Sequence, residues 1–228
     1  MNIQNATQAL HRQRGAGFNS PRPLRDIILL GASAGGVDAM RSLVRCLPHD
    51  LPAAVFVVIH LRRDRETFLP SILSRAGPLP AHAAEDGEPM RPGRIYIAPP
   101  NRQLVLDGNL VRLRPGERAE RWCPSVDALF QSAAEQHGLR VAAAVLTGYL
   151  NDGAAGLAQV KAEGGATIVQ DPHEALAADM PRNALRAVQA DYTLPLAAIP
   201  PVLSWLSGHG AQAAAAASRF GRICESSS

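Results

Sequence analysis

The sequence predicts an α/β fold: a doubly wound, mostly parallel sheet with helices on both faces. Apolar runs of strand length alternate with amphipathic segments of helix length. The runs are apolar throughout, as is typical of parallel strands that are buried on both faces. The predicted pairs of strand and following helix are 27–30 with 37–47, 54–59 with 67–76, 141–146 with 154–163, and 166–169 with 180–187.

Three shorter runs interrupt this alternation, at residues 94–98, 103–106 and 110–113. The last two are separated by Asp107-Gly108-Asn109, and Asp-Gly between apolar runs is a strong hairpin signal. The sequence therefore predicts an antiparallel hairpin excursion around residues 94–113.

The predicted domain covers residues 25–207. Residues 1–24 are rich in Gln, Asn, Arg, Gly and Pro without a sustained apolar period, which predicts a flexible leader. Residues 208–228 form an Ala- and Ser-rich tail with little apolar area for docking.

Composition excludes several classes of protein. The 23 Lys and Arg residues against 20 Asp and Glu give a net charge of +3, too weak for a protein that binds nucleic acid by neutralising many phosphates. No signal peptide and no run of 18 apolar residues occurs, so we expect a cytoplasmic protein without membrane insertion. The three cysteines share no disulfide or zinc spacing, and neither a metal site nor a cofactor is predicted.

The glycine-rich turn after the first predicted strand, GASAGG at residues 31–36, has three interpretations. Dinucleotide binding is disfavoured, because Ser33 stands at the middle glycine position and the second strand ends in His60 rather than an acid. A G-x-S-x-G turn would expose Ser33 as a nucleophile. A plain glycine turn would leave Ser33 as the N-cap of the following helix.

Two further polar residues follow predicted strands. His60 follows the second strand, where a general base is needed, and Asp152 lies in the turn after the strand at 141–146. Each also has a structural interpretation, His60 as a hydrogen-bonded strand end and Asp152 as a helix N-cap. Parallel strands bring such residues to one sheet edge, which favours a Ser33, His60 and Asp152 constellation.

At this point the sequence resembles the catalytic domain of the chemotaxis-type protein-glutamate methylesterases, the CheB family. The resemblance rests on segments spread in order along the predicted domain: GASAGG (31–36), VVIHL (57–61), IYIAPPNRQLVL (95–106), CPSVDALF (123–130), LTGYLNDGAAG (146–156) and ADMPRNAL (178–185).

The resemblance implies a serine esterase that hydrolyses glutamate methyl esters on chemoreceptor proteins, with glutamine deamidation as a second activity of relatives. It implies Ser33 as nucleophile, His60 as base and Asp152 as the residue that orients the histidine. The amides of the segments holding Ala34 and Tyr149 would form the oxyanion hole.

The chain departs from the family pattern at several positions. Leu150 replaces a glycine that serves an unusual backbone angle, and Tyr149 replaces a methionine beside the substrate. Gln103 stands where histidine is frequent, a change that could alter receptor preference. Tyr149 and Leu150 keep open the alternative of a non-catalytic interaction or scaffold protein with the same fold, and a nucleotide-binding module is the other alternative.

The implied partners are the methylated cytoplasmic helices of chemoreceptors. These helices are acidic, so Arg62, Arg63 and Arg65 could attract them, although a solvated arginine-rich loop is an equally good interpretation. Relatives carry a receiver domain that a leader of about 25 residues cannot supply. The expectation is therefore constitutive activity or control by a separate regulatory protein.

Overall fold

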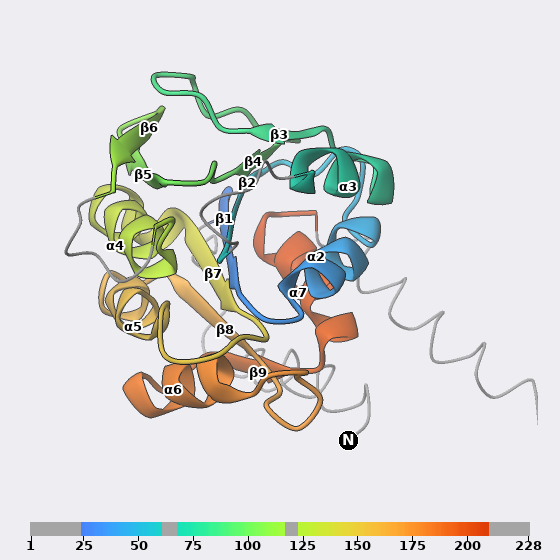
Figure 1. The fold of residues 1–228 in the computed structure, drawn as a ribbon, viewed down its shortest axis with the longest axis vertical. Helices are drawn as coiled ribbons and strands as arrows, with labels where there is room; N and C mark the ends of the chain where they lie inside the picture. The colour runs from blue at the N-terminus through green and yellow to red at the C-terminus, as the bar shows by residue number, and fades with distance from the viewer. Residues whose placement is uncertain (1–23, 61–67, 117–122, 210–228) are drawn as a thin grey trace, which may run out of the picture.

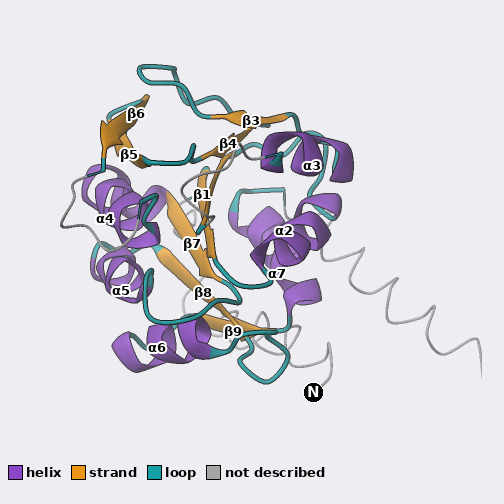
Figure 2. Cartoon of the chain, in the orientation of Figure 1, coloured by secondary structure: helices purple, strands orange, loops and turns teal. Residues whose placement is uncertain are grey.

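The core of the protein is a seven-stranded, fully parallel sheet (Figures 1 and 2). The structure is a computed structural model that describes residues 24–60, 68–116 and 123–209. Its sheet order is β3-β4-β2-β1-β7-β8-β9. The strands are β1 (Ile27–Ala32), β2 (Ala54–Ile59), β3 (Ala81–Ala83), β4 (Ile95–Ile97), β7 (Val141–Val145), β8 (Ala166–Gln170) and β9 (Tyr192–Leu194).

Helices cover both faces of this sheet, as predicted (Figure 2). One face carries α2 (Gly36–Arg45), α3 (Leu69–Ala76) and α7 (Ile199–Leu206), and the other carries α4 (Val126–His137), α5 (Ala154–Ala162) and α6 (Asp179–Ala187). Two short 3₁₀ turns, η2 (Gly138–Arg140) and η3 (Leu196–Ala198), complete the regular structure of the described residues.

Strand β1 shows why the predicted strands are apolar throughout. All six of its residues are buried, and its side chains alternate between two hydrophobic clusters. Ile28 and Leu30 pack with α2, α3 and α7, whereas Ile27 and Leu29 pack with α4, α5 and α6. A central strand with helices on both faces has no solvent side, which favours aliphatic residues at every position.

The predicted antiparallel hairpin is confirmed as β5 (Arg102–Asp107) and β6 (Leu110–Pro115). Gly108 adopts a φ of 55° in the turn, a left-handed conformation that glycine accepts without strain. The first part of the predicted excursion behaves differently, because β4 pairs in parallel with β2 and β3 in the main sheet.

The chain order in the sheet reverses beside β1. The first half of the chain places β2, β4 and β3 on one side of β1, and the second half places β7, β8 and β9 on the other side. Such a reversal opens a crevice at the carboxyl ends of the strands, where α/β proteins bind their ligands. The loops after β1, β2 and β7 all begin at this edge.

Two predictions fall largely on residues that the structure does not describe. The leader at 1–24 and the tail at 208–228 lie outside the described residues except for Leu24, Gly208 and His209. Within the described ranges, no helix has the length and apolar character needed to cross a bilayer.

Candidate active site

Ser33 follows β1 directly and begins the turn into α2. Its amide donates to Thr147 O over 2.9 Å, and its carbonyl accepts from the Gly36 amide over 2.9 Å. Gly35 caps α2 in the left-handed conformation, with φ at 75°, and no side chain caps this helix. The interpretation of Ser33 as the helix N-cap is therefore wrong, and its hydroxyl is not used to start α2.

His60 follows β2, the strand next to β1. Its amide donates to Ala32 O over 3.2 Å, which fixes the histidine beside the residue that precedes Ser33. Its ring Nε2 lies 2.6 Å from Asp152 Oδ2, although the two residues are 92 positions apart in the sequence. The side chains are only 8% and 1% exposed, so this contact is shielded from water.

Asp152 lies between β7 and α5, but it does not cap α5. The N-cap of that helix is Gly153, with φ at 94° and no side-chain cap bond. The Asp152 carboxylate instead accepts three hydrogen bonds from the start of α4. The donors are the Val126 amide at 2.7 Å, the Asp127 amide at 3.0 Å and Ser125 Oγ at 3.0 Å.

These contacts determine the charge of Asp152. Burial alone would raise the pKa of its carboxyl, but the hydrogen bonds from His60 and from the Asp127 and Val126 amides outweigh burial and lower the pKa. The positive end of the α4 dipole acts in the same direction. Asp152 is therefore an ionised carboxylate that accepts from the imidazole at neutral pH.

Thr147 and Gly148 hold the loop after β7 against the serine turn. Thr147 Oγ1 donates to Ala34 O over 2.9 Å and accepts from the Ala177 amide over 2.9 Å. A Cβ added at Gly148 would lie 2.1 Å from Met180 Sδ and 2.8 Å from Ser33 Cβ. Only glycine allows the backbone to approach Ser33 this closely.

The two unusual residues of this loop lie at its tip. Leu150 has a φ of 69°, which confirms that this position requires an unusual backbone angle, and Asn183 Nδ2 donates to its carbonyl over 2.7 Å. Tyr149 and Leu150 are exposed, as is Leu176, whose side chain lies against Gly35. Exposed apolar side chains therefore flank the serine turn.

The predicted oxyanion donors also lie at this edge. Ala34 follows Ser33 in the turn into α2, and Tyr149 follows the glycine that lies against Ser33. Among the described residues, neither of these two amides donates a hydrogen bond within the protein.

Sequence reasoning missed the residues that support the aspartate. Ser125 and Asp127 contact Asp152 from the start of α4, and Gln103 Oε1 accepts from the Ser125 amide over 2.7 Å. Gln103 is 4% exposed, so it supports the α4 terminus from inside and does not face a receptor. A serine before an apolar, helix-length segment was the available signal. Arg62, Arg63 and Arg65 lie outside the described residues.

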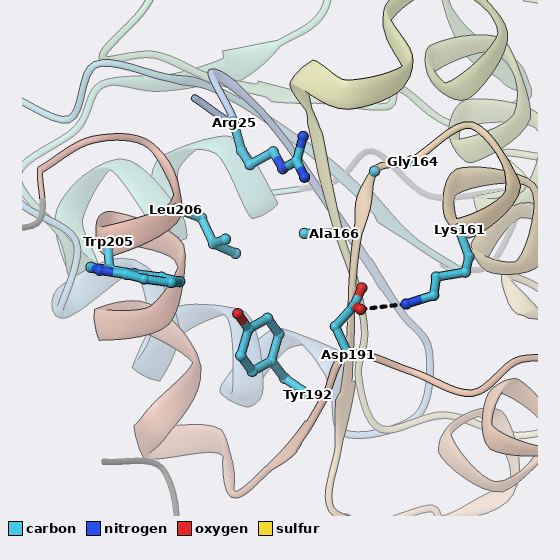
Figure 3. A pocket seen from close by; sticks show the side chains of 9 residues that line it. Arg25, Lys161, Gly164, Ala166, Asp191, Tyr192, Trp205 and Leu206 are labelled. Carbon is cyan, nitrogen blue, oxygen red and sulfur yellow. Dashed lines mark hydrogen bonds and ion pairs between the residues drawn. The ribbon is translucent and has the colours of Figure 1, made fainter. Parts of the chain in front are cut away.

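A pocket of about 300 Å³ opens at the other edge of the sheet, where β1, β8 and β9 begin (Figure 3). Lys161 points at Asp191 there and pairs with it, and Asp191 also accepts from the Thr167 amide and hydroxyl. Burial lowers the pKa of Arg25, which lines the same pocket, while the Asp191 charge raises it. Among the described residues that line this pocket, the charged side chains are Arg25, Lys161 and Asp191, and Lys161 is engaged by Asp191.

Comparisons with known proteins show the family to which this sequence and fold are similar. The family model described as CheB methylesterase matches residues 28–203. A "Protein-glutamate methylesterase/protein-glutamine glutaminase 2" from Anaeromyxobacter dehalogenans is 37% identical over 182 residues, covering 80% of this chain and 53% of that protein. A related protein from Leptospira interrogans is 37% identical over 174 residues, covering 75% of this chain and 89% of that protein.

A solved structure has the same fold. The crystal structure of the Thermotoga maritima CheB methylesterase catalytic domain superposes with a TM-score of 0.75 at 32% identity, and the match covers 79% of this chain and 98% of that one. The chain spans about half the length of the Anaeromyxobacter relative.

Proposed function

The chain belongs to the CheB methylesterase family, and from this premise we propose that it hydrolyses glutamate methyl esters on chemoreceptor proteins. Ser33 is the nucleophile, His60 is the general base, and Asp152 orients and stabilises the histidine. The observation that carries the proposal is the buried 2.6 Å contact between His60 and Asp152, at the edge where Ser33 leaves β1. Glutamine deamidation uses the same groups on an amide in place of an ester.

The reaction begins when His60 takes the proton of Ser33 as Oγ attacks the ester carbonyl. Because Nε2 of His60 contacts Asp152, Nδ1 is the nitrogen that accepts this proton. The amides of Ala34 and Tyr149 bind the oxyanion that forms on the carbonyl oxygen. His60 then returns the proton to the departing methoxide, and methanol leaves an acyl-enzyme.

Water completes the cycle. His60 removes a proton from a water molecule, the resulting nucleophile attacks the acyl carbon, and Ser33 leaves with its proton restored. Asp152 remains ionised through both halves, because three donors from the start of α4 stabilise its charge. It lowers the barrier by stabilising the imidazolium of each transition state, without taking the proton itself.

The exposed apolar side chains around the serine turn suit a protein substrate. Tyr149 is 61% exposed and Leu176 is 81% exposed, and both flank the segment that carries Ser33. Large exposed apolar side chains around a reactive group mark a surface that contacts another protein. We propose that the methylated receptor helix lies across this surface with its ester directed at Ser33.

The test is methanol release from a methyl-esterified receptor fragment. We expect Ser33→Ala and His60→Ala to lower kcat by about 10³-fold or more, and Asp152→Asn to lower it by a similar factor. Ser42→Ala is the matched control, because Ser42 is exposed on α2, and it should retain native activity. Circular dichroism shows whether each variant is folded.

A serine-reactive fluorophosphonate separates the alternatives. Labelling of Ser33 without methanol release would indicate an esterase with another substrate. A folded protein with neither labelling nor methanol release would be the non-catalytic interaction protein. A thermal shift with a dinucleotide would instead favour the nucleotide-binding module.

A further inference from the structure

Helices α4 and α5 begin side by side, and each has an acidic residue whose side chain bonds to the start of the other. Asp152, just before α5, accepts from the Val126 and Asp127 amides in the first turn of α4. Asp127, in that same turn, accepts from the Gly156 amide in the first turn of α5 over 2.6 Å. The two carboxyl groups thus form a reciprocal pair of helix caps.

The packing holds the two carboxyl groups at this spacing. A Cβ added at Gly156 would lie 2.6 Å from Phe130 Cβ and 3.1 Å from the Asp127 Cα, so the helices touch through a glycine. Added Cβ atoms at Gly31 and Gly153 would both collide with the Val126 side chain. The start of α4 is therefore fixed against β1 and α5 and cannot shift independently of Asp152.

We infer that Asp127 is a positioning residue of the proposed site, which sets the position and the electrostatic environment of the Asp152 carboxylate. The inference deepens the proposed function and rests on it. Asp127 acts in two ways: its amide donates to Asp152 Oδ1 over 3.0 Å, and its side chain lies next to the Asp152 carboxyl. Among the described residues its side chain bonds to the Gly156 amide and lies beside Asp152, and it acts on His60 through Asp152.

The pKa of the Asp127 side chain lies close to neutral pH. Burial raises the pKa of Asp127 to about 6, the Gly156 amide opposes this, and the charge of Asp152 adds to it. The pair therefore carries one negative charge below about pH 6 and two above it. The second charge strengthens the field that stabilises the imidazolium of His60 in the transition state.

The other groups around this pair are few. Asp152 faces Asp127 from the start of α5, and His60 lies behind Asp152 at the end of β2. Strands β1 and β7, on which α4 packs, contain only uncharged residues. On β5, Arg102 and Asp107 are exposed at the two ends of the strand, and Gln103 bonds to Ser125. Lys161 in the last turn of α5 pairs with Asp191, and Arg140 of η2 pairs with Asp26. The charge of Asp127 thus acts mainly on Asp152 and, through it, on His60.

Asp127→Asn tests the inference, because asparagine keeps the shape and the acceptor for Gly156 and removes the charge. We expect the ratio of native to variant kcat for methanol release to rise about 3- to 10-fold between pH 5 and pH 8, with a midpoint near 6. Ionisations that the Asp127 charge does not influence cancel in this ratio. A purely structural role would give a ratio that does not change with pH.

Asp38→Asn is the matched control. Asp38 occupies the first turn of α2, as Asp127 does in α4, but it is exposed and pairs only with Arg41 among the described residues. Its ratio should stay near one at every pH. A flat ratio for Asp127→Asn between pH 5 and 8 would overturn the inference.

A second readout separates this inference from the proposed function. If the native protein releases no methanol but Ser33 reacts with a fluorophosphonate, the same ratio is measured on the labelling rate, and the inference stands or falls on its pH dependence. If Asp127→Asn does not fold, chemical-shift titration of the native protein replaces it. The Asp127 carboxyl carbon should then titrate near pH 6, and the Val126 amide proton, which donates to Asp152, should report the same step. A Val126 amide that does not respond overturns the inference.

Discussion

At the scale of single residues, Leu150 stands out because a leucine occupies a left-handed backbone conformation. Its φ is 69°, and its carbonyl is fixed by Asn183 Nδ2. A side chain in this region costs about 1–2 kcal/mol, because its Cβ crowds the following carbonyl oxygen. The loop keeps this conformation because it carries Gly148 against Ser33 on one side and leads to Asp152 on the other.

Leu150→Gly should therefore stabilise the protein. Glycine removes the backbone strain but loses about 0.5–1 kcal/mol through its flexible unfolded chain, so we expect a net gain of roughly 0.5 kcal/mol in the free energy of unfolding. Urea denaturation measures it. Leu139→Gly is the control, since Leu139 is also exposed but lies outside the left-handed region, and it should lose stability. Equal losses for both variants would show that Leu150 is not strained.

The sequence predicts the placement of the candidate residues better than their hydrogen bonds. His60 and Asp152 were expected at one sheet edge because both follow parallel strands, and the structure places them in direct contact. The capping interpretations of Ser33 and Asp152 were wrong, because glycines in left-handed conformations begin both following helices. Local sequence shows that a helix begins, but it does not show which distant carboxylate caps it.

At the scale of elements, helix α4 supplies more hydrogen bonds to Asp152 than do strands β1, β2 and β7, which the candidate residues follow. Its N-terminus supplies three donors to Asp152, and its macrodipole favours the ionised carboxylate. Ser125 begins this helix, with its Oγ accepting from the Ala128 amide over 3.3 Å and donating to Asp152 Oδ1. One hydroxyl thus links the start of α4 to Asp152, the residue proposed to orient His60.

Ser125→Ala should affect stability and activity together. Loss of an N-cap costs about 1 kcal/mol in the free energy of unfolding, and loss of a donor to Asp152 weakens the support of His60. We expect kcat to fall by roughly 3- to 10-fold, which is the effect of about 1 kcal/mol. Ser125→Thr keeps the hydroxyl and should restore both quantities. Failure of threonine to restore activity would contradict a role for the hydroxyl.

Helices with a strong hydrophobic periodicity could be predicted from the sequence, whereas α4 could not. The predicted helices at 37–47, 154–163 and 180–187 correspond to α2, α5 and α6 within a few residues. The segment CPSVDALF contributes to the family resemblance. The role of α4 depends on a contact between Ser125 and Asp152, which are 27 positions apart in the sequence. Likewise, β4 is short, and its parallel pairing with β2 is decided by tertiary contacts.

At the scale of the whole molecule, the topology separates two edges of one sheet. The carboxyl edge brings together loops from both halves of the chain beside β1, because the strand order reverses there. The amino edge holds the pocket with Arg25 and the Lys161–Asp191 pair (Figure 3). The helix termini that favour a carboxylate, those of α4 and α5, are both at the carboxyl edge, and this favours the chemistry at that edge.

The pairing of Asp127 with Asp152 at the carboxyl edge lowers the stability of the fold. Folding partly buries Asp127 beside the ionised Asp152 and raises its pKa to about 6, above the ordinary carboxyl pKa near 4. A group whose folded pKa is raised contributes its full stability below its unfolded pKa and loses it as pH rises through its folded pKa. The native fold therefore loses stability at Asp127 between about pH 4 and pH 6, while the lowered pKa of Asp152 adds stability above about pH 4.

Asp127→Asn should accordingly be more stable than the native protein at pH 7.5, by on the order of 1 kcal/mol after allowance for solvent screening, and equally stable near pH 4. Asparagine carries no charge beside Asp152 and still accepts from Gly156, so the difference reports the ionisation alone. Urea denaturation at the two pH values measures it. Asp38→Asn, which loses only an exposed pair with Arg41, is the control and should be no more stable than native at either pH. A variant less stable than native at pH 7.5 would show that the Asp127 charge stabilises the α4–α5 contact. We expect Asp127→Asn to be more stable than the native protein and to have a lower kcat above pH 6. This combination indicates that the Asp127 charge acts on Asp152, because neutralising a residue that only supports the fold would leave kcat unchanged.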